Sequence, residues 1–106
     1  MRAITLTADD LELVRTCFDV GAGDAETEVD LGFAPGTFDA LAGALAAADA
    51  DQPIMIDAAL LPALAGAIGV GAETEIDGLT DAAYYRALAI AEAIDGPGPA
   101  PTVGFV

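Results

Sequence analysis

Hydrophobic and polar residues follow one another along the start of the chain first in a strand-like and then in a helix-like pattern. Residues 2–6 alternate, with Ile4 and Leu6 on the same side, which predicts a short strand. Thr7 is placed to cap a following helix, because its hydroxyl can accept a hydrogen bond from a backbone N–H of the first turn. The apolar stripe of that helix, expected over about residues 8–20, is formed by Leu11, Val14 and Phe18.

The next segment repeats this order of strand and helix. From Glu26 to Leu31, acidic side chains alternate with Thr27, Val29 and Leu31, which predicts a half-buried strand with an acidic, solvated face. Pro35 suits the first turn of a second helix. The apolar stripe predicted for this helix consists of Phe38, Leu41, Leu45 and Ala48.

The second half of the chain has the same pattern. Residues 53–56 predict a strand, and Asp57 is a candidate cap for the helix that follows, which Pro62 is expected to delay or kink. Residues 73–77 predict a second acidic strand, and residues 81–95 predict a final helix. The stripe of the helix after Asp57 consists of Leu61, Leu64 and Ile68.

Two hexapeptides, residues 25–30 and 72–77, are nearly identical. The first is Ala-Glu-Thr-Glu-Val-Asp and the second is Ala-Glu-Thr-Glu-Ile-Asp. The apolar positions before them also match at an offset of 50 residues, which pairs Ile4 with Ile54, once residues 22–24 are treated as an insertion. Self-similarity of this kind predicts a duplicated structural unit.

These elements predict one domain, residues 1–96, built from two copies of a βαβα unit at about residues 2–49 and 53–95. The expected fold is α/β, with a four-stranded sheet, four short helices and internal pseudo-two-fold symmetry. Because the crossovers are short, an α+β arrangement stays open. Residues 97–106 are expected to form a flexible C-terminal tail, given their proline and glycine content.

The charge of the chain narrows its possible partners. Eighteen carboxylates face three arginines and no lysine, for a net charge of −15. Direct binding of nucleic acid is disfavoured, because phosphate contacts need Lys and Arg. Two interpretations remain open. One is adaptation to a salty cytoplasm, where salt screens repulsion between carboxylates, and the other is an acidic surface that docks a basic protein.

Several residue types that carry chemistry are absent: the chain has no His, Ser, Lys, Asn or Trp. This excludes Ser-His-Asp and Cys-His pairs, lysine Schiff bases, histidine metal sites and the P-loop. We therefore expect no enzyme, no cofactor and no metal site. Cys17 is the single cysteine and is expected to be a buried structural thiol. The glycine pairs at 21 and 23 and at 69 and 71 follow predicted helices and are interpreted as helix stops.

The longest uncharged run, residues 58–72, is 15 residues long and contains Pro62 and three glycines. A transmembrane helix needs about 20 apolar residues, so this run predicts a buried core helix and no membrane partner. No signal-peptide pattern follows Met1, and a cytoplasmic location is expected.

The two predicted acidic strands are the main candidate site. If they lie side by side near the pseudo-two-fold axis, their carboxylates converge and can dock a basic protein surface or a hard cation. The simpler alternative is that they are only the solvated faces of two strands. The residues concerned are Glu26, Glu28, Asp30, Glu73, Glu75 and Asp77.

The helix expected after Asp57 is apolar on nearly every side, unlike its counterpart in the first copy. A helix of this kind is normally buried. It forms either a homo-oligomer or partner interface, or a central helix covered by its own chain. The interface candidates are Leu60, Leu61, Leu64, Ile68 and Tyr85.

Together these observations favour a small, non-enzymatic acidic binding protein, for example an inhibitor or antitoxin-like partner of a basic nucleic-acid-handling protein. The alternative is a self-assembling structural or scaffold subunit from a salt-adapted, halophilic source. A carboxylate-based enzyme or a cation-binding module is the least favoured class.

Overall fold

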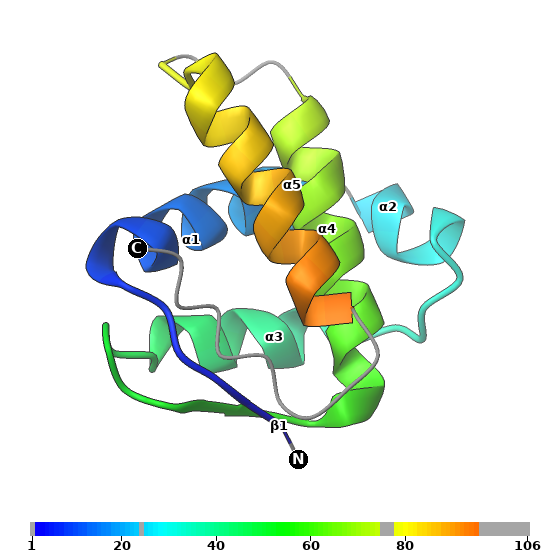
Figure 1. The fold of residues 1–106 in the computed structure, drawn as a ribbon. Helices are drawn as coiled ribbons and strands as arrows, with labels where there is room; N and C mark the ends of the chain where they lie inside the picture. The colour runs from blue at the N-terminus through cyan, green and yellow to red at the C-terminus, as the bar shows by residue number, and fades with distance from the viewer. Residues whose placement is uncertain (1, 24, 75–77, 96–106) are drawn as a thin grey trace.

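The computed structural model describes residues 2–23, 25–74 and 78–95, which are mainly helical (Figure 1). The elements in chain order are β1 (Arg2–Ile4), α1 (Ala8–Ala22), α2 (Ala25–Asp30), α3 (Thr37–Ala46), β2 (Ile54–Ile56), the 3₁₀ helix η1 (Ala58–Leu60), α4 (Leu61–Glu73) and α5 (Asp81–Asp95).

Four of these helices start where the sequence predicts a helix or close to it. Local capping explains the starts of α1 and η1. The Thr7 hydroxyl accepts a hydrogen bond from the backbone N–H of Asp10 at 3.2 Å and caps α1. A carboxylate oxygen of Asp57 accepts from the N–H of Ala59 at 3.0 Å and starts η1. Pro62 lies in the first turn of α4, where its missing N–H costs no hydrogen bond. The α-helix itself begins after the 3₁₀ turn η1, so its start is delayed by that one turn.

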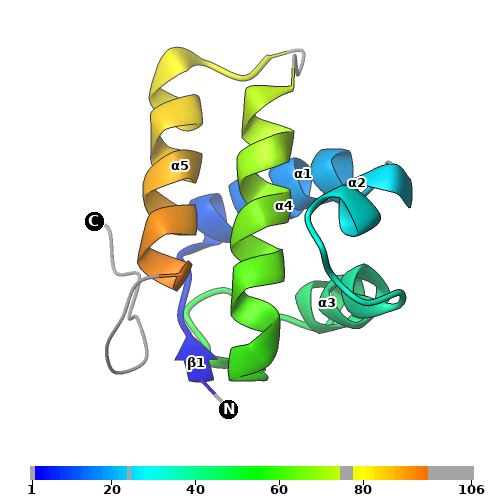
Figure 2. The same ribbon diagram turned by 90° about the vertical axis from the view of Figure 1, so that its right-hand side faces the viewer.

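The helix α4 is the centre of the fold. It lies against both α1 and α5, with α5 running antiparallel beside it and α1 crossing it (Figures 1 and 2). Its apolar side chains are buried on several sides, as expected for a helix with so few polar positions. The largest fully buried side chains of the protein are Phe18, Ile4, Leu6, Leu41, Leu64, Ile68, Ile90, Ile94, Val14 and Cys17.

The prediction of a four-stranded α/β sheet is wrong, and so is the tandem βαβα order. Within the described residues the sheet has two short strands, β1 and β2, which pair antiparallel. The register places Arg2 opposite Ile56, Ala3 opposite Met55 and Ile4 opposite Ile54. Residues 25–30, predicted as the first acidic strand, form α2 instead, and Glu73 of the second acidic segment ends α4. Residues 75–77 of that segment lie outside the described residues.

The segment of α2 alternates like a strand but is helical, and its burial explains the error. A half-buried strand needs a partner strand and an apolar face that is covered. Instead Val29 is 68% exposed and Leu31 is 39% exposed. Ala and Glu are good helix formers, so local preference favours a helix where no strand is available for pairing.

The helices α1 and α4 cross at Gly21 and Gly71, where the prediction of helix stops is wrong, whereas Gly23 does end α1 as its C-cap. Gly21 and Gly71 both lie inside helices, in close contact with the backbone of the opposite helix. A Cβ at Gly21 would collide with the carbonyl of Ala67, and a Cβ at Gly71 would collide with that of Cys17. Glycine is therefore required at both positions for the two helices to pack this closely.

The crossing is reciprocal under the sequence alignment of the two halves. At the offset of 50 residues Cys17 corresponds to Ala67, and Gly21 corresponds to Gly71. Ile4 likewise lies opposite Ile54, its own counterpart, in the sheet. That the halves descend from one duplicated unit stays a prediction. The predicted tail, residues 97–106, lies outside the described residues.

Candidate functional site

The side chains of two of the three arginines are described, and both are engaged inside the fold. Arg15, on α1, donates from Nε and Nη2 to the carbonyl of Leu45 at 3.0 and 2.8 Å, and from Nη2 to that of Ala48 at 2.7 Å. These carbonyls lie at and just beyond the C-terminal end of α3, where that of Leu45 also accepts from the N–H of Ala48 at 3.2 Å. Arg15 thus supplies the positive charge that the last turn of α3 lacks.

The second arginine joins α5 to α1. Arg86 donates from Nε to one Asp10 oxygen at 2.9 Å and from Nη2 to the other at 2.6 Å, a bidentate ion pair. The hydrogen bond to Asp10, aided by the charge of this carboxylate, raises the pKa of Arg86. Asp10 is only 5% exposed, whereas Asp9 and Glu12 on the same helix are exposed.

Three of the exposed carboxylates form a stripe along α1. Asp9, Glu12 and Asp19 are exposed and follow one another at helical spacing. None of them forms an ion pair with a described residue. Other exposed acids are spread over the remaining elements, namely Asp30, Asp39, Asp49, Asp51, Asp57, Glu73, Asp81 and Glu92.

Of the six carboxylates predicted to converge on one sheet face, the four in the described part of the chain belong to helices rather than to a sheet. Glu28 lies on α2 and accepts hydrogen bonds from the N–H groups of Gly36 at 3.3 Å and Phe38 at 2.9 Å. It thereby caps the N-terminus of α3, whose N-cap, Gly36, has no side chain to do so. Sequence reasoning missed this role, for which no local motif exists.

Of the other predicted carboxylates, Asp30 is exposed at the end of α2 and Glu73 is exposed in the last turn of α4. The backbone of Glu26 belongs to α2, but its side chain is outside the described part of the chain. Glu75 and Asp77 also lie outside the described residues.

The five predicted interface residues differ in their burial. Leu61, Leu64 and Ile68 are buried in the core of the single chain, as in the alternative of a central helix covered by its own chain. Leu60 is half-buried. Tyr85 is 68% exposed on α5, with its ring in edge-to-face contact with Tyr84, 5.2 Å between centroids.

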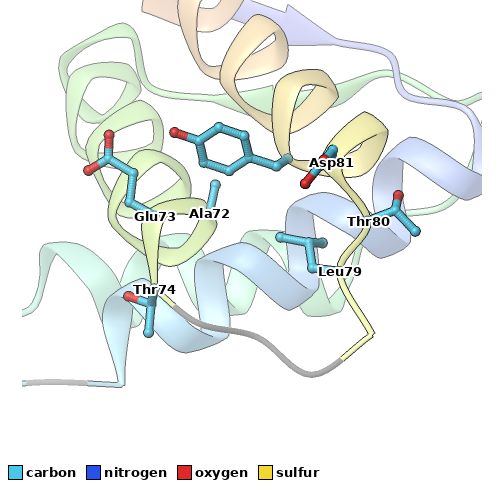
Figure 3. Close-up of a pocket in the computed structure, with 7 residues that line it drawn as sticks. Ala72, Glu73, Thr74, Leu79, Thr80 and Asp81 are labelled. Atoms are coloured by element: carbon cyan, nitrogen blue, oxygen red, sulfur yellow. The ribbon is translucent and has the colours of Figure 1, made fainter.

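A hollow of about 530 Å³ lies where the end of α4 faces the start of α5. Figure 3 shows Glu73 on α4 and Asp81 on α5 at opposite sides of it, with Ala72 between them. Tyr84 and the two threonines Thr74 and Thr80 complete its lining together with Leu79. Among the described residues that line it, these two carboxylates are the only charged groups.

The chemistry available to this surface is limited. Among the described residues, no three His, Cys, Asp or Glu side chains are grouped so that they could hold a metal ion. Cys17 is fully buried between α1 and α4, and desolvation raises the pKa of its thiol, so it is a poor nucleophile.

No protein-family model, curated protein or solved structure matches this chain. No helix among the described residues is long and apolar enough to cross a membrane.

Proposed function

We propose that this chain is a non-enzymatic binding protein whose carboxylate surface docks a basic protein, as an inhibitor of a nucleic-acid-handling protein would. The observation that carries the proposal is the use of the arginines. Arg15 neutralises the end of α3 and Arg86 pairs with Asp10, so neither is placed to neutralise the stripe of Asp9, Glu12 and Asp19.

An unneutralised carboxylate surface attracts a basic protein over distance and repels acidic competitors. It speeds association and gives a preference for basic partners, and its effect falls as salt rises. Nucleic-acid-handling proteins carry basic surfaces for phosphate, which makes them suitable partners for such a surface.

The test is recovery of the tagged full-length chain from its native host at near-cytoplasmic salt, with quantification of what co-purifies. We expect one basic protein in stoichiometric amount, released as salt is raised. Neutralising the stripe with Asp9→Asn, Glu12→Gln and Asp19→Asn should reduce capture. The matched control, Asp39→Asn with Asp49→Asn and Asp51→Asn, removes the same charge elsewhere.

Recovery of the chain alone, or as a defined oligomer that tightens as salt rises, contradicts the proposal. That result would assign the charge to salt adaptation and favour a self-assembling subunit instead. If both triple variants reduce capture equally, docking depends on total charge and the α1 stripe has no special part in it.

A further inference from the structure

We propose that the hollow between α4 and α5 receives one arginine side chain of the basic partner, whose guanidinium lies between Glu73 and Asp81 and against the ring of Tyr84. This inference rests on the proposed function and names the part of the partner that the hollow binds. The hollow combines space for a side chain, two carboxylates and the aromatic ring of Tyr84.

Glu73 and Asp81 line the hollow from two different helices, and neither forms an ion pair or hydrogen bond with a described side chain. Two carboxylates beside a cavity of about 530 Å³ create a negative potential there. A single cation between them would reduce their mutual repulsion.

The helix termini add to this potential unequally. Glu73 stands in the last turn of α4, where carbonyl groups already carry negative partial charge and no basic residue offsets it. Asp81 stands in the first turn of α5, where its carboxylate is partly balanced by the helix dipole. The Glu73 side of the hollow is therefore the more strongly negative one.

The shape and lining favour a guanidinium over a compact ion. Tyr84 is half-buried and lines the hollow, so its ring can offer a face on which a planar cation stacks. The hydroxyl of Thr74 already donates to the carbonyl of Val70 at 2.8 Å, and that of Thr80 accepts from the N–H of Ala83 at 3.1 Å. The carboxylates are then the main acceptors left, and a guanidinium can donate to two carboxylates at once.

The experiment is a titration of the full-length, ¹⁵N-labelled chain, followed by amide chemical shifts at constant ionic strength. The probe is N-acetyl-arginine methylamide, which carries one guanidinium and no other charge. The control probe is N-acetyl-citrulline methylamide, which has nearly the same shape without the charge. We expect saturable shifts centred on residues 72–74 and 79–84 with the arginine probe only.

Variants make the test specific to the hollow. Glu73→Gln should weaken binding of the arginine probe roughly fivefold, and Asp81→Asn should weaken it less, because only Glu73 adds to an unbalanced helix end. Asp39→Asn, an exposed site on α3 with the same change of charge, should leave binding unchanged. Equal responses to both probes, or shifts spread over all exposed carboxylates, would overturn the inference.

Partner capture with the Glu73→Gln, Asp81→Asn double variant separates this inference from the proposed function. If wild-type chain captures a basic protein but the arginine probe does not bind, the hollow is not the arginine site and the proposed function stands. If the probe binds at the hollow but no basic protein is captured, the proposed function fails. Loss of both probe binding and capture in the double variant supports the inference.

Discussion

At Gly71 the backbone of α4 touches the backbone of α1, and no side chain can be placed between them. Gly69, two residues earlier on the same helix, has open space where a Cβ would be. The two glycines are alike in sequence context, yet one is a packing requirement and the other only a weak point in a helix. This contrast gives a matched pair of substitutions.

Gly71→Ala should destabilise the protein by about 1–3 kcal/mol or more, because α1 and α4 must separate to admit the methyl group. Gly69→Ala should stabilise it by about 0.5–1 kcal/mol, because alanine restricts the unfolded chain and favours the helix. Urea unfolding followed by circular dichroism measures both. Equal effects of the two substitutions would show that the helices do not cross at Gly71.

At the scale of elements, charged side chains from one helix complete the ends of another. Arg15 on α1 serves the C-terminal carbonyls of α3, and Glu28 on α2 serves its N-terminal N–H groups. The short helix α3 is thus held at both ends by neighbours. Glu28, predicted only as a docking residue, therefore also has a structural role as the cap of α3.

Glu28→Gln should lower the free energy of unfolding by about 1 kcal/mol, because the charge and one acceptor at the N-terminus of α3 are lost. The control is Asp30→Asn, which makes the same change of charge at an exposed residue of the same helix. It should change the free energy of unfolding by no more than about 0.5 kcal/mol. Chemical denaturation at fixed salt compares them. If the two variants lose the same stability, net charge rather than capping explains the effect.

At the scale of the whole molecule, the net charge of −15 acts against folding. Arg86 offsets the charge of Asp10, and Arg15 donates to the carbonyls at the end of α3. In the α1 stripe, Asp9 and Glu12 lie about one helical turn apart, and Asp19 lies about 10 Å further along the axis, at a rise of about 1.5 Å per residue. Their repulsion is the part of the charge that added salt can screen.

The melting temperature should therefore rise by more than about 5 °C as sodium chloride is raised from about 0.1 M to about 1 M, since the Debye length falls from about 10 Å to about 3 Å. The variant Glu12→Gln, Asp19→Asn should show a smaller rise. Thermal unfolding in chloride salts measures this without the added effect of strongly excluded anions. A melting temperature that does not change with salt would show that repulsion between carboxylates does not destabilise this fold.

The sequence determined the features that depend on local chemistry. The caps at Thr7 and Asp57 form as predicted, and the last helix occupies residues 81–95. The apolar stripe of α4 is buried as its periodicity requires. Capping and periodic burial involve residues close together in the chain, so the pattern alone is enough to predict them.

Only the tertiary structure decided what the repeated hexapeptide becomes. In residues 25–30 it is a separate helix, whereas in the second copy Ala72 and Glu73 extend α4 and Thr74 is already extended. The strand prediction failed because alternation describes a strand only where another strand is free to pair. Helix packing rather than local sequence sets the remaining contacts. It brings together the two helix ends that line the candidate hollow, the bidentate pair of Asp10 and Arg86, and the two helices that cross at glycines.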